Sequence, residues 1–177
     1  MKKIICLLLA VFILLSGCSF ANGNIKEPVE FYYPRSCSRP DEYKTFFSEG
    51  AIASEIREAS GRRNDLYYLL SMYLRGPLDP NLHSPFPTGS AVVKVQQNDR
   101  ELSVYLNAVA ANLEAMDLTV ACSCLAQTCM ALADVDAVYI EAQNIDDKVL
   151  FSTTLSRGSL LLEESPPPST ISSEGTQ

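Results

Sequence analysis

A short helix with a fixed end is the feature that most restricts how this chain can fold. Between residues 66 and 74, apolar side chains recur at intervals of three and four positions, which predicts a helix with one face against a core. Asn64 or Asp65 can cap its first turn. Gly76 and Pro77 end it, because glycine adopts the left-handed conformation that follows a helix and proline cannot continue one. The apolar positions are Leu66, Leu69, Leu70, Tyr73 and Leu74.

Strands are predicted on both sides of this helix. Residues 29–33 are rich in β-forming residues and stop at Pro34, and a weaker strand pattern covers 51–56 after a long connection. A proline-rich connection over 79–89 leads to a predicted β-hairpin formed by 91–96 and 101–106, although its turn, Asn98-Asp99-Arg100, lacks the Asn-Gly pair typical of such turns. The alternating apolar positions of the hairpin are Val93, Val95, Leu102, Val104 and Leu106.

A second helix is predicted from about Asp117 to Asp134 or Asp136, followed by a buried strand over 137–140 and an edge strand over 149–153. The order strand, helix, hairpin, helix, strand predicts an α+β fold, with two helices packed on one face of a small mixed or antiparallel sheet. The apolar face of the second helix comprises Leu118, Cys122, Leu125, Cys129 and Leu132.

The first residues have the pattern of an export signal. Two lysines precede a twelve-residue apolar run from Ile4 to Leu15, which is too short to cross a hydrocarbon core of about 30 Å. The residues Leu15-Ser16-Gly17-Cys18 resemble the bacterial lipobox, which predicts cleavage before Cys18 and its modification with fatty acyl chains such as palmitate. We therefore expect the protein on the extracytoplasmic face of the cell membrane.

Four regions follow from these patterns. Residues 1–17 are a lipoprotein signal peptide, and 18–28 comprise the lipidated cysteine and a polar tether. Residues 29–162 form the domain, and 163–177 are a Pro/Ser-rich tail predicted to be disordered.

The charge excludes some partners. The whole chain has 14 basic and 21 acidic residues, and without Lys2 and Lys3 of the signal it has 12 and 21, a net charge of −9. We therefore expect no nucleic-acid partner and no docking on anionic lipid by charge alone, because both need a basic surface. Membrane association is expected through the lipid anchor.

The cysteines do not predict a metal site. Cys122 and Cys124 point about 200° apart on a helix, so they cannot share a tetrahedral ion. Cys122 and Cys129 share a face but lie about 10.5 Å apart along it, beyond the reach of a disulfide. Burial as small core residues is the favoured interpretation, and a disulfide from Cys37 to one helix cysteine stays open. We expect no metal and no cofactor.

Other polar residues do not form a recognisable catalytic pattern. His83 is the single histidine and adjoins Ser84, but neither lies in a nucleophile motif. The acidic pairs could suggest a glycosidase or calcium ligands, although aspartates are common at helix ends and turns. Arg62-Arg63 lacks the glycine-rich loop of a phosphate site. The acidic pairs are Asp134 with Asp136, and Asp146 with Asp147.

One group of residues is a candidate interface. Tyr67, Tyr68 and Met72 lie off the main apolar face of the first helix. They either complete the core or form an exposed apolar patch for a partner.

The connection after the first helix carries a family resemblance. Residues 74–90, LRGPLDPNLHSPFPTGS, resemble the GerM domain of spore-forming bacteria, in which a helix ends in Gly-Pro and Ser-Pro-x-Pro-x-Gly precedes a hairpin. Tyr32-Tyr33-Pro34 and Val135-Asp136-Ala137-Val138 are also similar to that family. The cysteines of the second helix and the glycine-free hairpin turn depart from it.

The resemblance implies a non-enzymatic role at the envelope of sporulating bacteria, in sporulation or germination. The fold is similar to domains that self-associate into rings, so the implied partners are envelope or sporulation proteins and a second copy. The resemblance supplies no catalytic residues. Two alternatives stay open: an envelope enzyme or accessory factor acting on peptidoglycan, and a carrier of a small solute, which a domain of about 134 residues does not favour.

Overall fold

The computed structural model describes residues 26–36 and 50–160, which form strands, helices and the connections between them. The predicted signal, Cys18, most of the tether, Cys37 and the predicted tail lie outside the described residues. The strands are β1 (Pro28–Pro34), β2 (Ile52–Glu58), β3 (Val92–Asn98), β4 (Glu101–Asn107), β5 (Ala137–Gln143) and β6 (Val149–Ser156). The helices are α3 (Leu66–Tyr73), the 3₁₀-helix η1 (Ala108–Ala111), α4 (Ala115–Leu132) and α5 (Arg157–Leu160).

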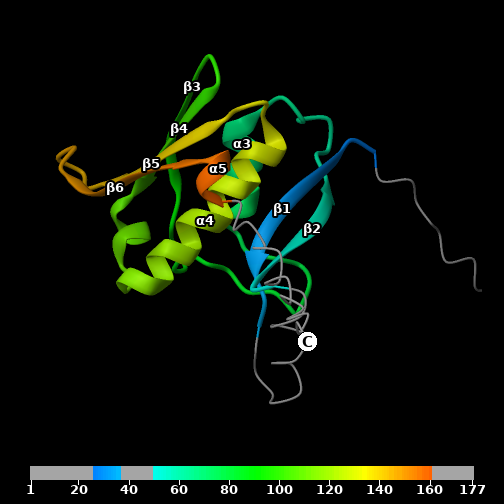
Figure 1. Cartoon of the computed structure of the whole chain (residues 1–177), viewed down its shortest axis with the longest axis horizontal. Coiled ribbons are helices and arrows are strands. Elements are labelled where there is room, and N and C mark those ends of the chain that lie inside the picture. Colours follow the sequence, from blue (N-terminus) through cyan, green and yellow to red (C-terminus); the bar gives the residue numbers. More distant parts are fainter. Residues whose placement is uncertain (1–25, 37–49, 161–177) are drawn as a thin grey trace, which may run out of the picture.

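The strands form two sheets (Figure 1). β1 and β2 pair antiparallel in one sheet, and the other has the order β3-β4-β5-β6. β4 and β5 are parallel, whereas β3 pairs antiparallel with β4 and β6 with β5. A parallel pair needs a long crossover, which α4 provides here. The predicted α+β class is confirmed, but β1 and β2 form a sheet of their own rather than joining the hairpin.

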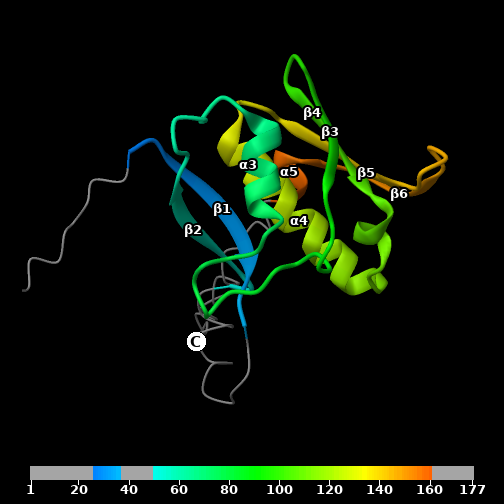
Figure 2. The ribbon, with the colours of Figure 1, turned by 180° about the vertical axis from the view of Figure 1, so that it is seen from behind.

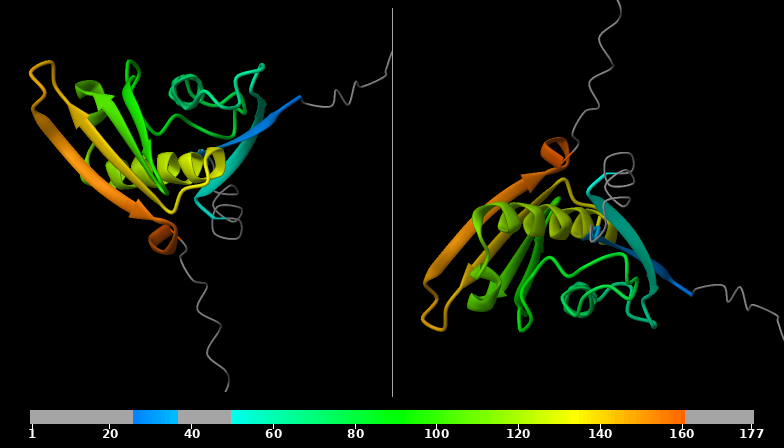
Figure 3. Two further views of the ribbon diagram at one scale, coloured as in Figure 1. Left: turned by 90° about the horizontal axis from the view of Figure 1, so that it is seen from above. Right: turned by 90° about the horizontal axis from the view of Figure 1, so that it is seen from below.

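The helix α4 lies between the two sheets and contacts both (Figure 3). Its burial is wider than the predicted face, because Cys124 and Thr128 are buried together with Cys122, Leu125 and Cys129. The backbone N–H of Tyr32 in β1 donates to Thr128 Oγ1 at 2.9 Å. By length and composition alone α4 could cross a membrane. Because α4 contacts both sheets, its apolar composition is that of a core helix.

The hairpin contains a β-bulge that changes the predicted face of β3. The register shifts between Val92 and Lys94, so Val92 is buried while Val93 is 54% exposed. The predicted alternation placed Val93 on the same face as Val95, which is half-buried. The difference follows from the bulge, because one inserted residue turns the preceding side chains to the other face. At the turn, Asp99 adopts a φ of 51°, a conformation that Asn-Gly turns provide with glycine.

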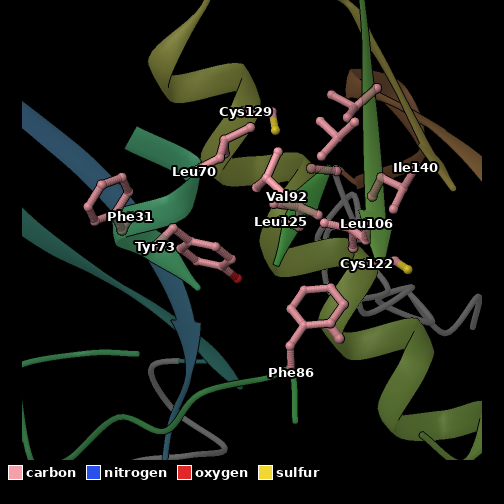
Figure 4. Close-up of a cluster of buried hydrophobic side chains, with 14 of the residues drawn as sticks. Phe31, Leu70, Tyr73, Phe86, Val92, Leu106, Cys122, Leu125, Cys129 and Ile140 are labelled. Atoms are coloured by element: carbon pink, nitrogen blue, oxygen red, sulfur yellow. The ribbon is translucent and has the colours of Figure 1, made fainter. Parts of the chain in front are cut away.

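The core joins residues from α3, α4 and both sheets (Figure 4). Phe31 and Tyr33 of β1 contact Tyr73 of α3, with ring centroids 5.9 and 4.8 Å from the Tyr73 ring. Leu70 of α3 and Leu125 of α4 belong to the same cluster, which also includes buried residues of the four-stranded sheet. This packing holds α3 between β2 and β3 (Figure 2). One pocket lies on each side of the helix.

Candidate functional site

The first turn of α3 and the loop after it are held by polar contacts. Asp65 accepts a hydrogen bond from the Tyr68 N–H at 2.9 Å, so Asp65 rather than Asn64 is the N-cap. Gly76 has a φ of 93°, as the predicted helix end requires. Beyond it, the N–H groups of Leu78 and Asp79 donate to Glu55 Oε2 at 2.8 and 2.9 Å. The loop after α3 is therefore fixed against β2.

Arg57 of β2 is the central residue of this attachment. Its side chain is 8% exposed and forms an ion pair with Glu55. It also donates to the carbonyl of Gly76 at 2.6 Å, and its guanidinium lies 5.3 Å from the ring centre of Phe31. Burial raises the pKa of the neighbouring Tyr33 phenol, which donates to the carbonyl of Tyr73. These contacts satisfy the buried charge and give Arg57 a structural role.

The structure separates the three residues of the candidate interface. Tyr67 is 51% exposed and its hydroxyl donates to the Val92 carbonyl at 3.2 Å, on the β3 side of α3. Tyr68 is half-buried beneath the Arg62 guanidinium, 4.7 Å from its ring centre. Met72 lies about 140° around the helix from Tyr67. Tyr67 and Met72 therefore belong to two different surfaces.

Met72 lines an apolar groove between α3 and β2. The groove has a volume of about 530 Å³. Two of its residues are strongly exposed, Ile56 at 58% and Leu78 at 80%. Neither was a predicted interface residue, because each is a single apolar residue in a polar stretch and they meet only in the folded chain. The groove is lined by Ile56, Arg57, Glu58, Met72, Arg75, Gly76, Pro77 and Leu78.

The apolar groove adjoins an open strand edge. Within the described residues, β2 pairs with β1 alone. The Tyr32 N–H points to α4, so Tyr32 and its partner Ser54 form a non-hydrogen-bonded pair. By the alternation of antiparallel pairing, Ser54 and Ile56 turn their N–H and carbonyl groups away from β1. An edge of this kind can accept an additional strand.

A second pocket lies on the other side of α3. It has a volume of about 440 Å³, and Tyr67 contributes to its wall. We call it the hydroxyl pocket, since it is lined by Tyr67, Ser71, Leu74, Arg75, Ser84, Thr88, Gly89, Ser90, Ala91 and Val92. Arg75 borders both this pocket and the apolar groove.

The structure also places the other polar candidates. His83 is exposed, and the hydroxyl of Ser84 donates to the Phe86 carbonyl at 3.0 Å. Asp134 and Asp136 both pair with Arg100, whose hydrogen bond lowers the pKa of Asp136. Within the described ranges, no three histidine, cysteine, aspartate or glutamate residues are grouped to hold a metal.

The remaining charged candidates have structural contacts. Asp146 and Asp147 lie in the turn between β5 and β6, where the N–H of Asp146 donates to Asn144 Oδ1 at 3.0 Å. Arg63 donates to the carbonyl of Pro28.

The helix cysteines are held as thiols. Cys122, Cys124 and Cys129 are buried, and none of them forms a disulfide with another residue in the ranges that the structure describes. Burial raises the pKa of Cys122 to about 11 and that of Cys124 to about 12, and it raises the pKa of Cys129 as well. Thiols with raised pKa values are poor nucleophiles and poor metal ligands at neutral pH.

Comparison with known proteins identifies the fold. No protein-family model and no curated protein matches the sequence. The tandem GerMN domains of the sporulation protein GerM from Bacillus subtilis match with a TM-score of 0.52 and 14% identity, over 80% of this chain and 48% of that one. The first GerMN domain of that protein matches with a TM-score of 0.53 and 15% identity, over 74% of this chain and 98% of that one.

The chain therefore spans about half the length of the tandem structure and nearly all of the single domain. At these identities the likeness establishes the fold alone. The domain is GerM-like in fold, as the resemblance of residues 74–90 predicted.

Proposed function

We propose that this chain is a lipid-anchored, extracytoplasmic binding module that acts by protein–protein contact at the cell envelope, in sporulation or spore germination. The GerM-like fold supports this proposal, because its solved neighbours belong to a sporulation protein. The lipobox-like residues 15–18 support the anchor at Cys18. The proposed role needs no catalytic residue and no cofactor.

The apolar groove is the observation that carries the proposal. Ile56 and Leu78 present exposed apolar side chains next to the partly buried Met72, beside the β2 edge that no other described strand covers. Exposed apolar clusters of this kind are typical of protein interfaces. An extended segment of an envelope or sporulation protein, or of a second copy, would pair with β2 and place an aliphatic side chain in the groove.

The test compares three strains, which carry a deletion, an Ile56→Asp/Leu78→Asp variant and an Ile145→Asp control. Ile145 is fully exposed in the turn between β5 and β6, so its substitution introduces the same charge away from the groove. We expect the deletion and the groove variant to lose heat-resistant spores or germinate slowly, and the control to behave as wild type. Normal spores in the groove variant, at normal protein levels, would contradict the proposed interface.

Two further measurements separate the parts of the proposal. Normal spores and germination in the deletion strain itself would refute the sporulation role. The anchor is tested by fatty-acid labelling, in which Cys18→Ala should remain unlabelled while the wild-type chain is labelled.

A further inference from the structure

The hydroxyl pocket has a lining suited to a ligand rich in hydroxyl groups. Ser71 Oγ donates to the Tyr67 carbonyl at 2.7 Å, and Ser84 Oγ donates to the Phe86 carbonyl at 3.0 Å. With their protons engaged, both oxygens keep lone pairs that accept hydrogen bonds. Ser90 Oγ is buried without a hydrogen-bond partner in the described part of the chain. The hydroxyl of the exposed Thr88 is a further donor and acceptor at the rim.

Arg75 adds a positive charge to this lining. Its side chain is exposed, and it forms no ion pair with the residues that the structure describes. The other arginine that lines the apolar groove, Arg57, is buried and paired with Glu55. Arg75 therefore keeps its guanidinium available for a carboxylate, which it can bind through two parallel hydrogen bonds.

The walls of the pocket are fixed without a ligand. Asn107 of β4 holds the segment 89–91 by two hydrogen bonds. Its side-chain N–H donates to the Gly89 carbonyl at 2.9 Å, and its side-chain oxygen accepts from the Ala91 N–H at 3.1 Å. On the opposite wall, the Tyr67 hydroxyl donates a hydrogen bond to the Val92 carbonyl. A site held in this way loses little conformational freedom when a ligand binds.

We propose that the hydroxyl pocket binds an anionic saccharide. The sugar ring would lie on the half-exposed Tyr67, its hydroxyls would bond to the serine and threonine hydroxyls, and its carboxylate would pair with Arg75. The volume of about 440 Å³ falls in the range of small-ligand sites. Arg75 is the one lining residue that the pocket shares with the apolar groove, which lies on the other side of α3, and the inference does not require the proposed protein interface.

The test measures saccharide binding to the full-length protein in detergent by calorimetry and ligand-observed NMR. The probe is the disaccharide of N-acetylglucosamine and N-acetylmuramic acid, which carries one carboxylate. Its neutral counterpart is di-N-acetylchitobiose. We expect saturable binding of the anionic disaccharide and about tenfold weaker binding of the neutral one, a difference of about 1.4 kcal/mol, because the neutral sugar has no carboxylate to pair with Arg75.

Variants assign the binding to the pocket. Arg75→Gln should remove the preference for the anionic sugar, and Thr88→Val with Ser71→Ala should weaken both sugars. Arg62→Gln, a matched arginine outside the pocket, and Ile56→Asp in the apolar groove should leave binding unchanged.

Three results would overturn the inference. The first is no saturable binding of either sugar at millimolar concentration. The second is unchanged affinity for the anionic sugar in Arg75→Gln. The third is equal binding of inorganic phosphate with full displacement of the sugar, which would indicate a simple anion site.

Discussion

Arg57 shows how a single charged residue can connect two elements of a small domain. Its guanidinium is shared by Glu55, the Gly76 carbonyl and the ring of Phe31. Glu55 in turn accepts the N–H groups of Leu78 and Asp79. The apolar groove therefore depends on a buried polar network for its shape, although its exposed surface is mainly aliphatic.

We expect Arg57→Met to destabilise the domain by about 3 kcal/mol, because the substitution leaves the mostly buried carboxylate of Glu55 without its cation. Chemical denaturation gives the free energy of unfolding. Arg63→Met is the matched control, since Arg63 is exposed and should change stability by less than about 1 kcal/mol. A loss of similar size in the two variants would contradict the role assigned to the network.

The buried cysteines predict how stability depends on pH. Their pKa values in the folded chain are raised by burial, to about 11 for Cys122 and about 12 for Cys124, from an ordinary value of 9.0. The unfolded chain therefore releases these protons at lower pH than the folded chain does. Stability is fully present below about pH 9 and should fall as the pH rises toward the folded values.

Denaturation midpoints measured between pH 8 and 10.5 test this dependence. The stability of a Cys124→Ala variant should fall less than that of the wild type across the same pH range. At pH 8 the thiols are mostly protonated in both states, so a difference in stability there reports the change in packing. An identical pH dependence in the variant would show that other groups cause the fall.

At the scale of elements, the first turn of α3 carries a testable cap. Asp65 accepts the N–H of Tyr68, whereas Asn64 is exposed and precedes it. We expect Asp65→Ala to cost about 1 kcal/mol of unfolding free energy, because the N–H of Tyr68 loses its acceptor. Asn64→Ala should have little effect. Equal losses at the two positions would mean that the side chain of Asp65 is not the cap.

The sequence predicted the elements better than their arrangement. Periodicity located both main helices, and Gly76-Pro77 correctly placed the end of α3, because these signals are local. The bulge at Val93 was missed, since nothing in an alternating apolar run marks one inserted residue. The separate sheet of β1 and β2 was also missed, because a strand's apolar positions do not specify which strand it pairs with.

The residues of the candidate site also depend on how the elements are arranged, which the sequence did not predict. Tyr67, Tyr68 and Met72 were identified from their helical positions, but α3 presents them to different surroundings. Ile56 and Leu78 come from a strand and a loop that are far apart in the sequence. The contacts of the loop with β2 through Glu55 and Arg57 bring them together. The hydroxyl pocket likewise depends on the position of α3 beside β3.

At the scale of the whole molecule, α4 is the element that joins the two sheets. Its Thr128 is buried, and its side-chain oxygen accepts the N–H of Tyr32 on the edge of β1 that faces away from β2. This bond engages one edge of the two-stranded sheet, whereas the β2 edge has no strand partner among the residues that the structure describes. The fold thus directs any added strand to the side that borders the apolar groove.

We expect Thr128→Val to lower stability by about 1–3 kcal/mol, because the substitution keeps the shape of the side chain but leaves the N–H of Tyr32 without an acceptor. Thr119→Val on the exposed face of α4 is the matched control, and it should change stability by less than about 0.5 kcal/mol. Hydrogen exchange should accelerate in β1 and β2 of the Thr128 variant more than in β4 and β5. Uniform acceleration across both sheets would show that the domain opens as one unit, and that Thr128 does not specifically hold the two-stranded sheet in place.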